Sequence, residues 1–184
     1  TVAIRWDSNS HEVTLFRNYL GDGLFRSAAA KVWQAARATS AAPTYFGPWE
    51  HTGASKAQYV DGGLTCDNPS PVGSLEAKLL FGKQLQDVSV LSAGTGTVPL
   101  HVQSQSLNPS ILEVKGLARR LVDVGMASTS FLTKDMMPHL LPPQNYLRVN
   151  GRVLDGDMAD AKLIPSWQEE AEHLVSRANP TSEA

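Results

Sequence analysis

An acidic residue followed by two glycines stands where a short strand is expected to end. Residues 57–60 (AQYV) favour a strand, and Asp61, Gly62 and Gly63 follow at once. Functional groups of α/β folds gather at the carboxyl ends of strands, where a carboxylate can orient or deprotonate a neighbouring nucleophile. The alternative is that Asp61 only caps a turn, because Asp-Gly-Gly is also a common turn sequence.

Three other groups of polar residues are weaker candidates for chemistry. The turn SAGTG at 92–96 lacks the Lys-Ser/Thr ending of a P-loop and the spacing of a dinucleotide fingerprint, which favours a tight turn. The acids of DGDMAD at 155–160 lack the closing glutamate of a calcium loop, which favours a surface turn. No two histidines have the spacing of metal ligands; they are His11, His51, His101, His139 and His173. We therefore expect neither a metal nor a cofactor.

Alternating strands and helices surround the Asp-Gly-Gly turn. Short strands are expected at 2–6, 13–16, 58–60, 87–96 (ending in the glycine-rich turn) and 145–151. Helices are expected from Ser27, as N-cap, to Pro43, and at 72–82, 111–133 and 166–178. The order strand, helix, strand is typical of βαβ units, so the sequence predicts an α/β domain with a mostly parallel sheet.

Composition excludes several classes of protein. The chain of 184 residues is 42% hydrophobic and 18% charged, which is the composition of a folded globular domain. Its net charge of −2 and lack of a long basic run argue against nucleic acid as a partner. No apolar run approaches the roughly 18 residues of a membrane span. The single cysteine, Cys66, cannot form an internal disulfide and fits a reducing compartment.

The first residues, TVAIRW, already favour a strand. We therefore expect the chain to be part of something longer. Residues 1–177 are expected to form the C-terminal portion of a single domain, and 178–184 a frayed tail.

Several segments in the same order and with the same gaps resemble the patatin-like phospholipases. They are WQAARATSAAPTYF at 33–46, YVDGGLTCDNPSP at 59–71 and VLSAGTG at 90–96, flanked by VTLFRNY at 13–19 and NYLRVN at 145–150. The resemblance extends from about Val13 to Asn150, and its most specific part is ARATSAAPTYF together with the Asp-Gly-Gly motif.

This resemblance implies a three-layer α/β domain of the patatin type and a lipid acyl hydrolase with a Ser-Asp dyad. Asp61 would be the general base, and Gly62 and Gly63 would complete its motif. The substrate would be a lipid or another acyl ester, as for a phospholipase A, and no calcium would be needed. A serine becomes nucleophilic when such a base removes its proton.

The departure from the family pattern concerns the nucleophile. The expected G-x-S-x-G motif is absent from the 184 residues; Ser55 in GASKA is a partial match without a preceding strand or following helix. A glycine-rich oxyanion loop is missing too. We therefore expect the nucleophile-bearing N-terminal half of the domain upstream of Thr1, and this chain alone to be inactive. The alternative is a fragment or pseudo-enzyme that serves as a lipid-binding or interaction module.

The loop TYFGPW carries three aromatic residues shortly before the Asp61 strand. Tyr45, Phe46 and Trp49 could line the acyl cleft, or they could pack between helix and sheet. The apolar stretch MMPHLLPP at 136–143 is compatible with peripheral membrane contact, or with burial in the core. A cytoplasmic or peripheral membrane location follows from these expectations.

Overall fold

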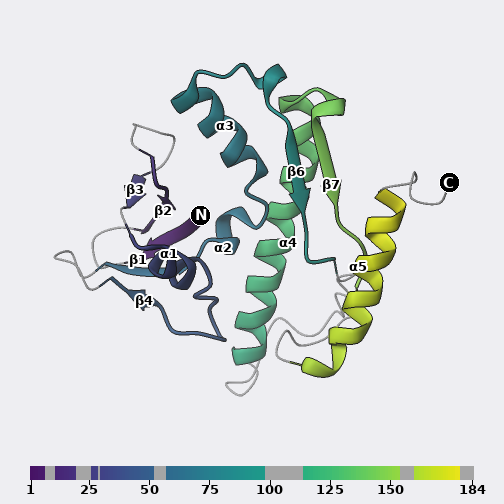
Figure 1. Ribbon diagram of the computed structural model, residues 1–184. Coiled ribbons are helices and arrows are strands. Elements are labelled where there is room, and N and C mark those ends of the chain that lie inside the picture. The colour runs from purple at the N-terminus through teal and green to yellow at the C-terminus, as the bar shows by residue number, and fades with distance from the viewer. Residues whose placement is uncertain are drawn as a thin grey trace.

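The computed structural model describes residues 1–6, 11–19, 26–28, 30–51, 57–97, 114–153 and 160–178. Within these ranges the chain forms two separate sheets (Figure 1). The five-stranded sheet has the order β3-β2-β1-β5-β4, with bounds Arg26–Ala28, His11–Phe16, Val2–Trp6, Gln58–Asp61 and Trp49–Glu50. The second sheet pairs β6 and β7, with bounds Val90–Ala93 and Tyr146–Val149.

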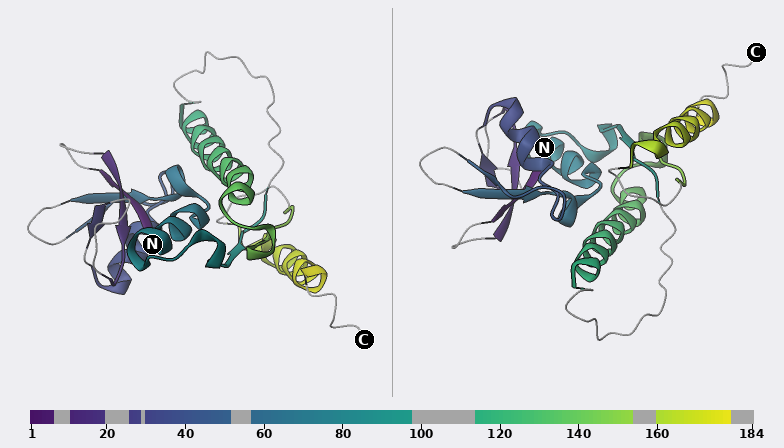
Figure 2. Two further views of the ribbon diagram at one scale, coloured as in Figure 1. Left: turned by 90° about the horizontal axis from the view of Figure 1, so that it is seen from above. Right: turned by 90° about the horizontal axis from the view of Figure 1, so that it is seen from below.

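Five α-helices accompany the two sheets in the part of the chain that is described. Their bounds are Val32–Thr39 (α1), Gly63–Cys66 (α2), Ser70–Phe81 (α3), Val114–Leu140 (α4) and Ile164–Ala178 (α5). Short 3₁₀ helices cover Leu85–Asp87 (η1), Pro143–Asn145 (η3) and Ala161–Leu163 (η4). Figure 1 shows α4 beside the β6–β7 pair, with α5 beyond that pair. Figure 2 shows that α4 projects to one side of the line that joins the five-stranded sheet to this pair. None of the described helices is both long and apolar enough to cross a membrane.

The expected mostly parallel sheet is corrected by the structure. In the larger sheet β1 pairs antiparallel with β2 and with β5, β4 pairs antiparallel with β5, and only β2–β3 is parallel. The short connection between β1 and β2 forces these two strands to run in opposite directions. The βαβ pattern does hold for β6 and β7, which are parallel and joined by a connection that contains α4. The fold is α/β, but the described residues do not form a clear three-layer parallel sheet.

The helix expected to start at Ser27 begins later. Residues 26–28 form β3 and pair with β2, and α1 runs only from Val32 to Thr39. The expected Ser27 cap is therefore wrong, because strand pairing overrides the high helix propensity of the alanines. Conversely, the turn expected after Asp61 contains the short helix α2.

The longest helix, expected at 111–133, extends into the apolar stretch that follows it. The last helix turn of α4 extends to Leu140 and carries Pro138. Met137 has no exposed surface, and Leu141, directly after the helix, is buried as well. At these two positions core burial is the observed outcome.

A small apolar core fixes the strand that leads to Asp61. Tyr59 in β5 packs with Phe16 of β2, with ring centroids 5.2 Å apart, and Ala3 and Ala38 fill the space beside them. Ala38 comes from α1, which lies across this face of the sheet. The small side chains allow α1 to approach closely, and the position of β5 follows from this packing.

Candidate functional site

Asp61 is the last residue of β5, and its backbone and side chain are both held. It lies opposite Ala3 in the pairing of β5 with β1, and its amide donates to the Ala41 carbonyl at 3.1 Å. The Asp61 Oδ1 accepts a hydrogen bond of 2.8 Å from the Gly63 amide, where α2 begins. The carboxylate is therefore anchored at a strand end through one oxygen.

The surroundings of Asp61 disfavour its charged form. Partial burial raises the pKa of its carboxyl above the ordinary value, and the hydrogen bond from Gly63 lowers it by a smaller amount. A carboxylate with a raised pKa is a stronger base, which suits the removal of a proton from a hydroxyl group.

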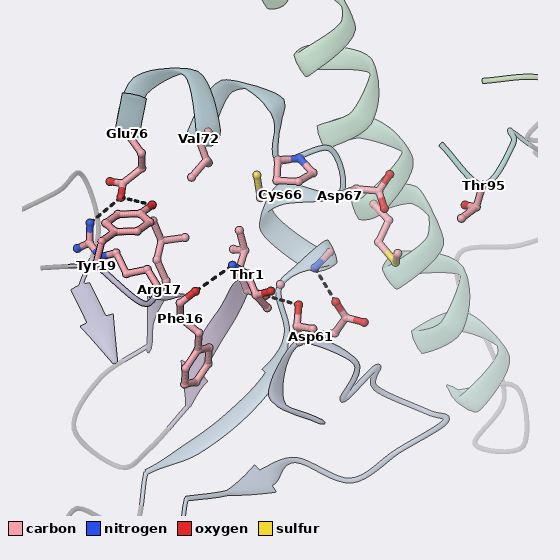
Figure 3. A pocket seen from close by; sticks show the side chains of 18 residues that line it. Thr1, Phe16, Arg17, Tyr19, Asp61, Cys66, Asp67, Val72, Glu76 and Thr95 are labelled. Carbon is pink, nitrogen blue, oxygen red and sulfur yellow. Dashed lines mark hydrogen bonds and ion pairs between the residues drawn. The ribbon is translucent and has the colours of Figure 1, made fainter. Parts of the chain in front are cut away.

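A cavity of about 670 Å³ adjoins the Asp61 carboxyl. Figure 3 shows Asp61 at one side of it and the side chains of Arg17, Tyr19 and Glu76 at the opposite side. The volume is in the range of small-molecule sites, and the wall has both apolar and charged parts. The arrangement places a carboxylate beside a space that is large enough for a small molecule.

The far wall of the cavity contains a buried ion pair. Arg17 Nη1 and Glu76 Oε2 are 2.5 Å apart, with side chains only 3% and 4% exposed. The Tyr19 hydroxyl donates to the same Glu76 oxygen at 3.3 Å, and the Arg17 guanidinium lies over the Tyr19 ring. Since Arg17 follows β2 and Glu76 belongs to α3, the pair joins the sheet to the helix that follows the Asp-Gly-Gly motif.

A second acid, Asp67, lines the same cavity at the end of α2. Burial raises the pKa of its carboxyl; a hydrogen bond with Ser130 and the charge of Arg148 lower it, and the charge of Asp61 raises it. The neighbouring Cys66 thiol also has a raised pKa because of burial and the Asp67 charge. Cys66 is therefore a poor nucleophile at neutral pH.

Asn68 ties the segment after Asp61 to the second sheet. Its buried Oδ1 accepts from the Ser70 hydroxyl at 2.6 Å and from the Ser92 hydroxyl of β6 at 3.3 Å. Arg148 of β7 donates to the same Ser92 hydroxyl at 2.7 Å. Asn68 thus shapes the turn after Asp61, and it also links the Asp61 motif to β6 and β7.

Gly62 is required by close packing. A Cβ atom at this position would lie 2.4 Å from the Val2 carbonyl oxygen, which already accepts a hydrogen bond from Thr39. The colliding atoms belong to the backbone of β1, so they cannot rotate away. The motif therefore lets the chain pass directly beside β1 as it leaves Asp61.

We expect Gly62→Ala to lower the free energy of unfolding by about 3 kcal/mol, the upper part of the usual cost of overpacking. The matched control is Gly125→Ala in α4, where a Cβ meets no atom within 4 Å. That change should stabilise the protein by about 0.5–1 kcal/mol, because alanine favours a helix. Urea unfolding of both variants measures the difference, and equal stabilities would contradict the role assigned to Gly62.

The aromatic candidates from the sequence lie apart from the cavity wall. The cavity lining includes Asp61, Gly62 and Gly63, but not Tyr45, Phe46 or Trp49. Phe46 is 58% exposed, so it is not a core residue either. Trp49 belongs to the same sheet as Asp61, where it pairs with Tyr59 of β5.

The weaker motifs are placed as follows. Asn150 accepts a hydrogen bond from the Gly96 amide at 2.8 Å, so the SAGTG segment is held against the end of β7. Ser55, His101 and residues 155–159 of DGDMAD lie outside the described residues. Among the residues that are described, no three His, Cys, Asp or Glu side chains are grouped as metal ligands would be.

Sequence reasoning missed the charged wall of the cavity. Arg17 directly follows a predicted strand, as Asp61 does, and that position was the available signal. Glu76 lies in the helix expected at 72–82, and a charged side chain on a helix usually faces solvent, so its burial was not predicted. The two residues are 59 positions apart, so no local pattern in the sequence indicates that they form a pair.

Comparison with known proteins covers the segment that contains the Asp-Gly-Gly motif. Residues 6–75 match the family described as Patatin-like phospholipase. A cGAMP-activated phospholipase of Escherichia coli (strain TW11681) is 36% identical over 169 residues, covering 83% of this chain and 46% of that protein. Human calcium-independent phospholipase A2-gamma is 30% identical over 145 residues, covering 74% of this chain and 17% of that protein. The chain spans less than half the length of these relatives.

Proposed function

Because this chain belongs to the patatin-like phospholipase family, we propose that it supplies the general base of a Ser-Asp lipid acyl hydrolase. The observation that carries the proposal is the Asp61 carboxyl, which is anchored at a strand end and borders a cavity of about 670 Å³. The relatives are named phospholipases, which supports a phospholipid or related acyl ester as the substrate.

The proposed reaction uses the two oxygens of Asp61 differently. The Gly63 amide holds Oδ1, so Oδ2 is the oxygen that would accept the proton of a serine hydroxyl. The serine oxygen attacks the ester carbonyl carbon, and the leaving alcohol departs with the proton from Asp61. Water, deprotonated by the same carboxylate, then attacks the acyl carbon, the bond to the serine oxygen breaks, and Asp61 returns the proton to that oxygen. The fatty acid is released and the serine hydroxyl is restored.

The serine would come from a part of the protein outside these 184 residues. Exposed leucine side chains on the β6–β7 sheet support this proposal. Leu91 and Leu147 are register neighbours in β6 and β7, and they are 72% and 54% exposed. Parallel strands are normally covered on both faces, so further chain packed on this sheet would remove an unusual exposure.

The experiment uses the full-length protein, meaning the product of the complete reading frame that includes this chain. Phosphatidylcholine vesicles are incubated with it, and released fatty acid is measured with and without a calcium chelator. We expect release in both conditions, in keeping with the name of the human relative. A fluorophosphonate probe should label one serine outside residues 1–184.

Residues 1–184 expressed alone are the control and should release no fatty acid. Serine-dependent hydrolysis by this piece would overturn the proposed division of the dyad. If the full-length protein neither hydrolyses lipid nor reacts with the probe, the chain is a binding module and the enzymatic proposal fails.

The raised pKa of Asp61 predicts the acid limb of the pH profile. Only the deprotonated carboxylate accepts a proton, so kcat/KM should fall as the pH drops through the Asp61 pKa, which lies above the ordinary value of 3.8. The raised pKa of Asp61 comes from burial, and the Gly63 hydrogen bond opposes it, so Asp67→Asn should leave this limb in place. A limb that moves to lower pH in Asp67→Asn would show that the Asp67 charge also raises the Asp61 pKa.

A further inference from the structure

An exposed aromatic surface lies on α1 and the segment that leads into β4. It consists of the exposed Val32, Trp33 and Phe46 together with Trp49, which is partly buried against the core, and we call it the aromatic surface. Val32 is 87% exposed, Trp33 61% and Phe46 58%. Large apolar side chains that lie together on a solvent-exposed face usually mark a contact with another molecule or with a membrane.

Packing holds the rings of this surface in place. The Trp33 and Trp49 rings meet edge to face with centroids 6.5 Å apart, and Trp49 packs in turn on the buried Tyr59 at 5.8 Å. One helix turn after Trp33, the Arg37 guanidinium lies over the Phe46 ring and donates to the Gly47 carbonyl at 3.1 Å. The surface is therefore pre-organised, and little conformational entropy would be lost when it binds.

The charges at its border favour an anionic lipid surface as the occupant. Lys31 is exposed directly before Val32, and Arg37 flanks Phe46. Glu50 is the acid closest in sequence, but side chains alternate along a strand, so it projects to the face opposite Trp49. Tryptophan beside lysine or arginine is the combination that enters the interface of a bilayer, where rings meet the headgroups and cations meet lipid phosphates.

The aromatic surface and the Asp61 site share one face of the sheet. Trp49 lies directly opposite Tyr59, and Tyr59 and Asp61 project to the same side because they are two residues apart in β5. The helix α1 joins the two places: Trp33 is at its start, and Thr39 at its end lines the cavity. The axial separation of these two helix residues is about 9 Å.

We propose that the aromatic surface, bordered by Lys31 and Arg37, docks the protein on an anionic lipid bilayer and so brings the Asp61 cavity to membrane lipid. This inference rests on the proposed function for its purpose, but the docking itself does not require hydrolysis.

The test uses full-length protein carrying Asp61→Asn, so that the vesicles stay intact. Binding is measured by co-sedimentation with vesicles of phosphatidylcholine alone and with one third phosphatidylserine. Trp33→Ala and Phe46→Ala should each weaken binding to the mixed vesicles at least about tenfold, because each removes a large apolar anchor. Lys31→Gln should weaken binding to the mixed vesicles about fivefold and leave binding to phosphatidylcholine unchanged.

Phe131→Ala is the matched control, because Phe131 is 57% exposed on α4 and Phe46 is 58% exposed. It should leave vesicle binding unchanged. The proposal is overturned if Phe46→Ala and Phe131→Ala have equal effects, or if Trp33→Ala abolishes self-association in sedimentation and leaves vesicle binding intact. The second result would assign the surface to another copy of the chain.

A soluble short-chain ester separates this inference from the proposed function. With Asp61 intact, Trp33→Ala should retain hydrolysis of the soluble ester and lose at least about tenfold in hydrolysis of vesicle lipid. Equal losses on both substrates would overturn docking as the role of Trp33. Hydrolysis of neither substrate by the parent protein, with vesicle binding that still depends on Trp33, would refute the enzymatic proposal and support the docking surface.

Discussion

Asp61→Asn in the full-length protein is expected to lower kcat/KM for phospholipid hydrolysis by at least about a hundredfold, the usual size of a general-base contribution. Asparagine has almost the same shape, and its Oδ1 can accept the hydrogen bond that Gly63 donates at 2.8 Å. The proton acceptor is lost and the local geometry is retained. The measurement is the initial rate of fatty acid release from mixed micelles at neutral pH.

The stability of Asp61→Asn supplies the control. Burial raises the pKa of Asp61 in the folded protein, so burying the charged carboxylate costs free energy and the protonated form favours folding. This favourable contribution is lost as the pH rises through the folded-state pKa. A neutral asparagine removes this cost of burying a charge. The variant should therefore be at least as stable as the parent at pH 7. Unchanged activity in a variant of equal stability would show that Asp61 only caps a turn.

Glu76→Gln is expected to lower the free energy of unfolding by about 3–5 kcal/mol, as for buried ion pairs that lose one partner. The Arg17 and Glu76 side chains are 3% and 4% exposed, so the guanidinium would keep its charge in a site with little water. The pair also connects β2 to α3 across the cavity. Urea unfolding followed by tryptophan fluorescence measures the loss.

The Arg5–Glu12 pair provides the comparison, because its charges are 3.7 Å apart and its side chains are 16% and 36% exposed. Glu12→Gln should cost no more than about 1 kcal/mol, since solvent screens the pair. Replacing both Arg17 and Glu76 with methionine should recover much of the loss seen in Glu76→Gln. Similar losses in Glu76→Gln and Glu12→Gln would mean that the buried pair is not desolvated as its exposure indicates.

The resemblance found in the sequence was confirmed by the family match and by the relatives, and local patterns predicted many of the elements. Gly82 ends α3 in the left-handed conformation, with φ of 62°, as a glycine after an apolar helical segment indicates. The strand before Asp61 is confirmed as well. In contrast, the alanines after Ser27 suggested a helix where β3 forms, because the hydrogen bonds of a neighbouring strand outweighed a small preference per residue.

By itself, the sequence determined that a strand ends at an aspartate followed by two glycines, because side-chain type and spacing control local conformation. It did not determine that β5 pairs antiparallel with β1, or that Arg17 meets Glu76 across the cavity. Nor did it determine that Asp67 lies near Arg148. These contacts join residues that are far apart in the chain. Their partners are selected when the sheets and helices pack together, and the free energy of that packing is absent from any short segment.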